Sequence, residues 1–221
     1  MEHMEKQYKV PLHVYTLGEE LVNSISHGVG ALFSIAVLVL CVVRAAQHGS
    51  MVGVVSSIVY GICMLLMYSA STIYHALKPN LAKRVFRVLD HCMVFLLIAG
   101  TYTPCTLVLL QGTLGWTLFG AVWTTAIAGI VLNAIDMKKF EILSMVCYLV
   151  MGWAIIVAIK PLMAALPHDG LVLLVAGGVS YTLGAILYGI GAKVRWIHCV
   201  WHFFVLAGSV LHFLCIFLYI L

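Results

Sequence analysis

Charged residues are scarce in this chain. Asp, Glu, Lys and Arg make up only 9% of its 221 residues, whereas they form about 25% of a soluble globular domain. So few charges cannot cover a surface that faces water, which excludes a soluble or disordered protein. The formal net charge of +4 is too small to indicate a nucleic-acid partner.

Cysteine is also sparse, and a familiar catalytic signature is missing. The seven cysteines are odd in number and no two of them form a Cys-x-x-Cys pair, which excludes a disulfide scaffold. The chain has no Gly-x-Ser-x-Gly sequence, so the serine nucleophile elbow is excluded as well. We therefore interpret the cysteines as small residues of the core.

Hydrophobic residues, by contrast, make up 63% of the chain. A helix needs about 20 apolar residues to cross about 30 Å of hydrocarbon. Seven segments meet this requirement, and their continuous runs are unlike the short alternating strands of a membrane barrel. They are residues 23–43, 51–74, 89–110, 114–135, 142–160, 171–190 and 197–221. The sequence thus predicts an all-α membrane protein, in which residues 1–221 form one seven-helix transmembrane domain that opens with a short cytoplasmic segment, residues 1–20.

The positive charges predict an orientation for this bundle. If the N-terminus lies in the cytoplasm, ten of the twelve Lys and Arg residues fall on the cytoplasmic side, and only Arg44 and Lys160 fall outside. Cytoplasmic loops carry such an excess, so we expect a cytoplasmic N-terminus and an extracytoplasmic C-terminus. The ten are Lys6, Lys9, Lys78, Lys83, Arg84, Arg87, Lys138, Lys139, Lys193 and Arg195.

Polar side chains inside the predicted spans gather at one depth. Such residues are costly in a bilayer and by default mark a site. In the predicted orientation, four separate stretches bring them to the cytoplasmic end of the bundle, which chance does not favour. They are Glu20, Asn23 and His27 where the first span opens, Ser71 and His75 at the end of the second, Asp90 at the start of the third, and His198 and His202 at the start of the seventh.

The spacing of the histidines is typical of a metal site. His198 and His202 are four residues apart and therefore lie one above the other on a helix face. With His75 they could supply three imidazole ligands, as in catalytic zinc centres that keep a fourth position for water. Asp90 could bind or orient that water, or act as a general base.

Structural interpretations stay open beside the metal site. The three histidines could simply hydrogen-bond to loops at helix ends, and Asp90 could form an ion pair with Arg84 or Arg87. We interpret His91 and His212 as packed, hydrogen-bonded side chains. The polar residues of the first span are expected to support the site rather than bind the ion.

The motifs together resemble the bacterial hemolysin III family, which belongs to the superfamily of progestin and adipoQ receptors. The resemblance covers nearly the whole chain and rests on Glu20-x-x-Asn23-x-x-x-His27, Ser71-x-x-x-His75 followed by Asp90, the run from Leu89 to Pro104, and His198-x-x-x-His202 with the run to His212. It implies a seven-helix bundle with an intramembrane zinc ion held by His75, His198 and His202. It also implies that Asp90 reaches the metal through water and that Ser71 supports the site.

This resemblance favours a zinc-dependent hydrolase of lipid amide or ester bonds, because the superfamily is similar to alkaline ceramidases in this constellation. A receptor-like or regulatory protein with a structural zinc is one alternative, and cytolysis, which the family name implies, is another. The expected partner is a membrane lipid, as substrate or ligand, whereas a protein partner and the choice between monomer and homo-oligomer stay undefined. We expect the chain in the bacterial cytoplasmic membrane, with the metal site near the cytoplasmic face.

Overall fold

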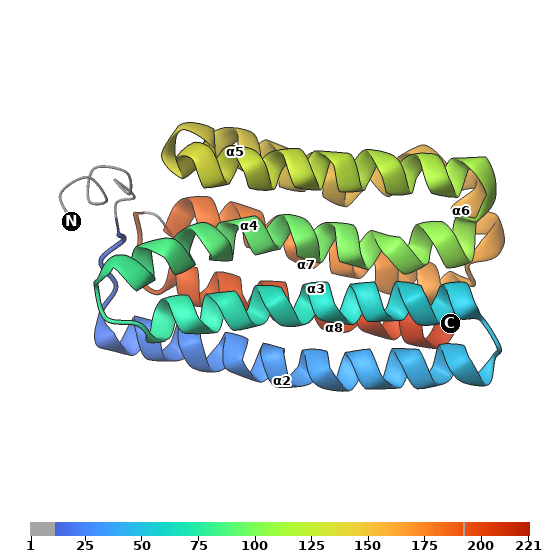
Figure 1. Cartoon of the computed structure of the whole chain (residues 1–221), viewed down its shortest axis with the longest axis horizontal. Coiled ribbons are helices and arrows are strands. Elements are labelled where there is room, and N and C mark those ends of the chain that lie inside the picture. The colour runs from blue at the N-terminus through green and yellow to red at the C-terminus, as the bar shows by residue number, and fades with distance from the viewer. Residues whose placement is uncertain (1–11, 192) are drawn as a thin grey trace.

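A computed structural model describes residues 12–221 except residue 192, so Lys6, Lys9 and most of the predicted N-terminal segment lie outside the described residues. The described chain forms helices joined by short turns (Figure 1). The long α-helices are α2 (Leu17–Gln47), α3 (Met51–Ala76), α4 (Leu81–Pro104), α5 (Gly112–Trp153), α7 (His168–Gly191) and α8 (Ile197–Cys215). The shorter elements are the π-helices η1 (Cys105–Leu110) and η3 (Ile216–Ile220), the 3-10 helix η2 (Ala154–Ala158) and α6 (Ile159–Ala165).

Six helical stretches in the described part of the chain are long and apolar enough to cross a membrane. Large apolar side chains stay exposed on their outer faces, as Leu32 (70%) and Ile142 (81%) illustrate; this suits a surface that faces lipid tails. The all-α membrane class is therefore confirmed. The count is six because residues 112–165, which contain two of the predicted spans, form one nearly continuous helical stretch.

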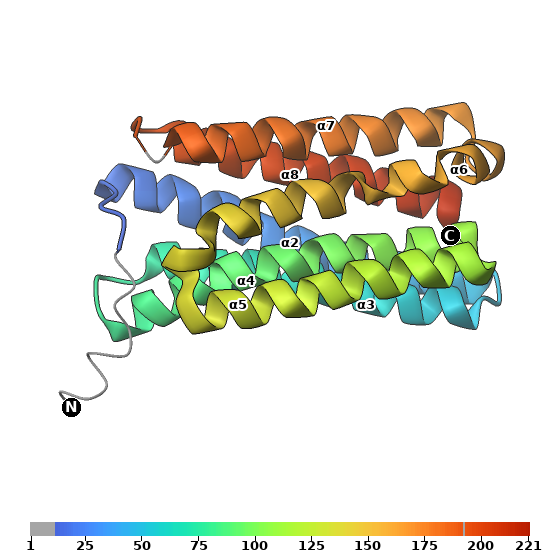
Figure 2. The ribbon, with the colours of Figure 1, turned by 90° about the horizontal axis from the view of Figure 1, so that it is seen from above.

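This stretch reverses direction at Asp136. The backbone there leaves the helical region (φ −156°, ψ 88°), and Figure 2 shows the chain turning back within α5. In place of the predicted connection 136–141, the chain has one non-helical residue, Asp136, with helix before and after it. The two halves of α5 pack on α4 in opposite directions, through hydrogen bonds from Trp123 to Thr103, from Cys92 to the Ile130 carbonyl, from Tyr148 to the His91 carbonyl, and from Tyr102 to the Gly152 carbonyl.

The helices run along a common axis, and their ends alternate between the two ends of the bundle (Figures 1 and 2). The start of α2, the end of α3 and the starts of α4 and α8 lie at one end. The short helix α6 and the C-terminal residue, Leu221, lie at the other. The topology therefore brings together the four helix ends that carry the polar residues of the predicted site.

Capping residues decide where the helices at this end begin. Thr16 precedes α2 and forms a capping box with Glu19, which satisfies free N–H groups of the first turn. The side chain of Asn80 accepts a hydrogen bond from the Lys83 N–H at 2.9 Å. Because of this cap, α4 begins at Leu81 and not near residue 89, where the apolar run begins. The added turns carry the Lys83 side chain into the bundle.

Gly30 allows α2 to pack closely against the buried ring of Tyr68. A Cβ atom at Gly30 would lie 2.5 Å from that ring, and the Tyr68 hydroxyl donates to Ser209 Oγ at 2.7 Å, which restrains it. We expect Gly30→Ala to lower the free energy of unfolding by about 1–3 kcal/mol, the usual effect of overpacking a core. Thermal unfolding in detergent measures this change.

Gly120→Ala is the matched control for Gly30→Ala. Nothing lies within 4 Å of a Cβ atom at Gly120, and alanine favours a helix over glycine by about 1 kcal/mol. The control should therefore be as stable as the wild type or more so. An equal loss of stability in both variants would contradict the role given to Gly30.

Candidate metal centre

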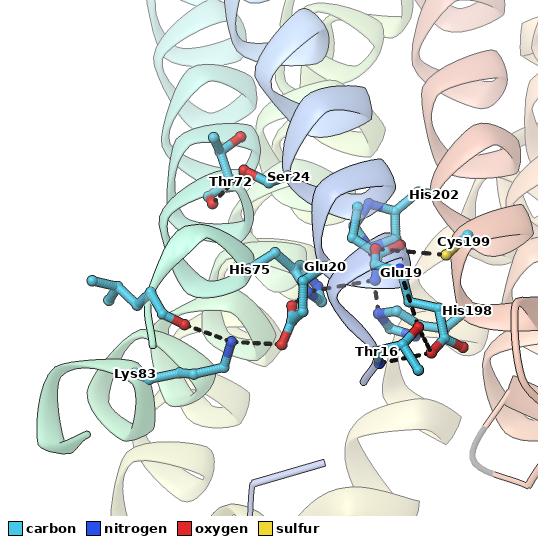
Figure 3. A network of polar contacts seen from close by, with 12 residues as sticks. Thr16, Glu19, Glu20, Ser24, Thr72, His75, Lys83, His198, Cys199 and His202 are labelled. Carbon is cyan, nitrogen blue, oxygen red and sulfur yellow. Dashed lines mark hydrogen bonds and ion pairs between the residues drawn. The ribbon is translucent and has the colours of Figure 1, made fainter. Parts of the chain in front are cut away.

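Three histidines from two helices meet at one end of the bundle. His75 lies in the last turn of α3, and His198 and His202 lie in the first turns of α8. One ligand nitrogen from each lies within 4.8 Å of the others, and all three side chains are buried. Figure 3 shows them around the first turns of α2. This arrangement could hold a metal ion.

Hydrogen bonds to the Nδ1 atoms of His75 and His202 leave the Nε2 atom of each ring free to bind a metal ion. His75 Nδ1 lies 2.7 Å from Glu20 Oε2, and a carboxylate only accepts, so Nδ1 carries the proton. Ser26 donates its single proton to the Asn23 carbonyl at 3.0 Å. It must therefore accept from His202 Nδ1, which lies 3.3 Å away. Both Nε2 atoms then keep a free lone pair.

The remaining nitrogens fit a metal ion. His75 Nε2 is buried and has no hydrogen-bond partner among the described residues, which is unfavourable unless a ligand satisfies it. The Nε2 atoms of His198 and His202 lie 3.3 Å apart. Two nitrogens that bind one tetrahedral ion at about 2.0–2.1 Å would be separated by about 3.3–3.4 Å. The donors present therefore match a divalent ion that accepts imidazole ligands.

Glu20 joins the histidine cluster to a buried lysine. One carboxylate oxygen contacts His75, and the other accepts from Lys83 Nζ at 2.7 Å. Lys83 is only 2% exposed and also donates to the Leu77 carbonyl at 2.9 Å. These contacts link the start of α2, the end of α3 and the start of α4 (Figure 3). A carboxylate that orients the ring of a metal-binding histidine is typical of metal centres.

The other polar residues predicted for the site surround the histidines. Asn23 Nδ2 lies 3.5 Å from His75 Nδ1, and His27 stacks on His202 with ring centroids 3.7 Å apart. Ser71 lies one turn before His75 on α3, and its buried hydroxyl has no hydrogen-bond partner in the part of the chain that the structure describes. These positions suit a supporting role, which stays a prediction.

Asp90 lies near the cluster and not in it. It is buried in α4 and lines a cavity of about 50 Å³ together with His198, Arg87 and Tyr15. Within the described residues, the group of converging ligand atoms contains the three histidines and not Asp90. The expected contact of Asp90 with the metal through water stays a prediction.

A larger, mostly apolar cavity begins at the same place. It has a volume of about 140 Å³ and shares four lining residues with the small cavity: Asp90, His91, Glu141 and Tyr188. From there it extends between α4, the second half of α5, α7 and α8. Its apolar and aromatic lining includes Met67, Leu97, Ile98, Leu149, Trp153 and Val205. The small cavity, which His198 lines, and a mostly apolar cavity are thus adjacent.

The two histidines that we interpreted as packed side chains line this larger cavity. His91 Nε2 lies 3.4 Å from the Tyr188 hydroxyl, and His212 Nε2 lies 3.1 Å from the Leu174 carbonyl. Neither belongs to the converging group found among the described residues.

The small cavity also holds a tyrosine from the segment before α2. Tyr15 is half-buried, and desolvation raises the pKa of its hydroxyl, with a further contribution from Tyr74. The hydroxyl therefore stays protonated at neutral pH and can donate a hydrogen bond.

Three contributors to the site were not singled out by the sequence patterns. Ser26 orients one imidazole, Lys83 pairs with Glu20, and Tyr15 stacks on His198. Ser26 could have been found from its spacing, because it continues the polar stripe of α2. Nothing in the local sequence marks Lys83 or Tyr15, since each reaches the site through contacts between distant segments.

The chain is similar to proteins of one family along most of its length. A family model described as haemolysin-III related matches residues 15–213. The hemolysin-3 of Bacillus cereus is 45% identical over 203 residues, which cover 92% of each chain. The hemolysin-3 homolog of Bacillus subtilis (strain 168) is 44% identical over 206 residues, covering 93% of this chain and 96% of its own. No solved structure matches the chain significantly.

A more distant match points to the wider superfamily. The monocyte to macrophage differentiation factor of Homo sapiens is 24% identical over 167 residues, which cover 73% of this chain and 69% of its own. This relation supports the superfamily of progestin and adipoQ receptors. The family match spans the polar stripe of α2 and all three histidines. The resemblance inferred from the motifs is confirmed, and the chain belongs to the hemolysin III family.

Proposed function

We propose that this chain is a seven-helix integral membrane protein that binds zinc near the cytoplasmic face and hydrolyses an amide or ester bond of a membrane lipid. The observation that carries the proposal is the buried histidine cluster beside a small cavity, lined by His198 and Asp90, which adjoins a larger, mostly apolar cavity. Ligand sites are commonly apolar spaces with a few convergent polar groups. Here a lipid chain could lie between the helices while its polar group reaches the cluster.

The reversal at Asp136 supports seven crossings. It divides α5 into two stretches that pack on α4 in opposite directions. The start of α2 and Leu221 lie at opposite ends of the bundle (Figure 1), and an odd number of crossings accounts for this. Helical spans also favour the bacterial cytoplasmic membrane, since outer-membrane proteins are typically barrels.

The distribution of positive charge supports a cytoplasmic metal site. The turns at the histidine end of the bundle, together with the helix ends next to them, hold eight of the ten described Lys and Arg residues. Arg44 lies in the last turn of α2 and Lys160 in α6, both at the other end. An excess of positive charge marks the cytoplasmic side.

Zinc is the ion that the donor set favours. Three neutral imidazoles with a position left for water are the protein ligands of many catalytic zinc centres. When bound, zinc would act as a Lewis acid and lower the pKa of water in the site to about 7.

Each residue around the cluster would then have a separate role in hydrolysis. Asp90, at the junction of the two cavities, would accept a proton at its carboxylate and return it to the leaving group. Glu20 and Ser26 would keep the imidazoles oriented, and Ser71 would support the site from the preceding turn of α3. The apolar cavity would hold the acyl chain and exclude bulk water.

Hydrolysis of labelled acyl lipids by the purified protein tests this proposal. We expect release of fatty acid by the wild type, and a loss of about 10²-fold or more in Asp90→Asn with the metal retained. Asp169→Asn is the matched control, because Asp169 lies in the first turn of α7 at the other end of the bundle. Full activity of Asp90→Asn would contradict the role of Asp90. A metal-loaded wild type that cleaves neither amide-linked nor ester-linked lipids would contradict the hydrolase.

A regulatory membrane protein with a structural zinc is the second candidate. The observation in its favour is that buried and partly buried contacts around the cluster link α2, α3, α4 and α8. Chelation should lower the unfolding temperature under both candidates, but only the enzyme should turn over a lipid. Cytolysis, which the names of the two Bacillus relatives indicate for those proteins, is tested separately by leakage of a dye from liposomes.

A further inference from the structure

The residues just before α2 lie against the histidine cluster. The ring of Tyr15 stacks between two imidazoles, with its centroid 4.4 Å from that of His13 and 5.0 Å from that of His198. The interplanar angles are 19° and 29°. The same ring lies 5.5 Å from His75. One tyrosine thus contacts two of the three metal-ligand candidates, which come from different helices.

Hydrogen bonds to the Glu19 side chain link this segment to the turn before α8. Its Oε2 atom accepts hydrogen bonds from the Thr16 N–H at 2.8 Å and from the Thr16 hydroxyl at 2.6 Å. Its Oε1 atom accepts from the backbone N–H of Trp196, 2.8 Å away in the turn before α8. The Glu19 side chain is buried, and Figure 3 shows it beside Thr16. Tyr15 is therefore held against α8 through the residue that follows it.

Tyr15 also belongs to the wall of the small polar cavity. Tyr15 and His13 supply one part of this wall, and Asp90, Arg87 and His198 supply another. Among the residues that line the cavity, Tyr15 stacks directly on a metal-ligand candidate. A change at Tyr15 therefore alters both the packing of the cluster and its exposure to the cavity.

We propose that Tyr15 is a positioning residue of the metal centre, whose ring holds the imidazoles of His198 and His75 and covers the bound ion so that it leaves slowly. This inference rests on the metal-binding part of the proposed function. The effect belongs to the ring and not to the hydroxyl, because stacking depends on the aromatic face. Residues that orient metal ligands without touching the metal change its affinity by about 10–100-fold.

The rate of zinc release tests this inference. The zinc-loaded full chain in detergent is mixed with an excess of the chromogenic chelator pyridylazoresorcinol, and the absorbance of the zinc complex is followed. We expect Tyr15→Ala to release zinc about 10-fold faster than the wild type or more, and Tyr15→Phe to stay within about 2-fold because its ring still stacks. Val14→Ala is the matched control, since Val14 is the neighbouring residue and is 91% exposed.

A second variant, Glu19→Gln, tests the same role while leaving the Tyr15 ring unchanged. Glu19→Gln loses an acceptor for Thr16 or Trp196 and keeps Tyr15, so its release rate should lie between those of the wild type and Tyr15→Ala. If Tyr15→Ala does not fold, the test rests on Glu19→Gln. Zinc release from Glu19→Gln at the wild-type rate would then overturn the inference.

The other outcomes separate this inference from the proposed function. Wild-type release from Tyr15→Ala would overturn the role of Tyr15 alone. Equal acceleration in Tyr15→Phe would overturn it as well, because the hydroxyl would then carry the effect. A wild-type chain that binds no zinc would overturn both proposals.

Discussion

Replacing His202 with alanine is expected to remove the metal from the purified protein. His202 is fully buried, and its Nε2 atom lies 3.3 Å from that of His198. Two imidazoles would remain where a zinc site uses three or four protein ligands. We expect about one metal ion per chain in the wild type and less than about a tenth of that in the variant. Elemental analysis of protein purified in detergent measures the ratio.

His212→Ala is the matched control for this measurement. His212 lies on the same helix and lines the larger cavity, and its Nε2 atom lies 3.1 Å from the Leu174 carbonyl. It should keep the metal content of the wild type. A His202→Ala protein with full metal content would show that the three histidines are not the ligands. Loss of metal in both variants would show that damage to α8, and not the ligand set, is being measured.

Changing Glu20 to glutamine is expected to weaken both the fold and the metal site. The amide cannot supply the negative charge that Lys83 Nζ contacts at 2.7 Å, and Lys83 is almost completely buried. An uncompensated buried charge costs about 3–5 kcal/mol, so the unfolding temperature should fall steeply. Metal affinity should fall about 10–100-fold, because His75 Nδ1 loses its carboxylate partner. Thermal unfolding and competition with a chelator measure the two effects.

A second substitution separates these effects. In Glu20→Gln combined with Lys83→Met, no buried ammonium needs a partner, so most of the lost stability should return. The metal affinity should stay low, because His75 still lacks the carboxylate. If the double variant recovered its metal affinity together with its stability, the proposed link between Glu20 and the metal would be wrong.

Arg195→Met is the control for Lys83→Met, because it also removes a positive charge near the start of α2. Arg195 has an exposed side chain whose Nε atom lies 4.0 Å from Glu19 Oε2. Exposed pairs contribute at most about 1 kcal/mol. A loss in this variant as large as in Glu20→Gln would mean that burial of Lys83 is not what makes its pair important.

The helices of this protein were predictable, but some of their ends were not. A long apolar run has one stable form in a bilayer, since only a helix satisfies its backbone hydrogen bonds within the segment. The predicted span 51–74 accordingly lies within α3, and 197–221 covers α8 and η3. The start of α4 departs from the apolar pattern because Asn80 caps the helix before the run begins. A single non-helical residue, Asp136, replaces the expected connection in α5.

The convergence of the three histidines was predictable in part for a similar reason. The spacing of His198 and His202 predicts a pair on one helix face, and the depth of His75 places it at the same end of the bundle. Which ring nitrogen faces the centre could not be predicted, because that depends on Glu20 and Ser26 of a different helix.

By itself, the sequence determined the membrane class, the family and the positions of the apolar spans, because these depend on composition, motifs and the order of residues along the chain. Only the tertiary structure decided that Lys83 pairs with Glu20, that Tyr15 stacks on His198, and that the apolar cavity adjoins the small polar cavity at Asp90. The physical reason is that these contacts join segments far apart in sequence. Their geometry follows from how whole helices pack, which no local pattern specifies.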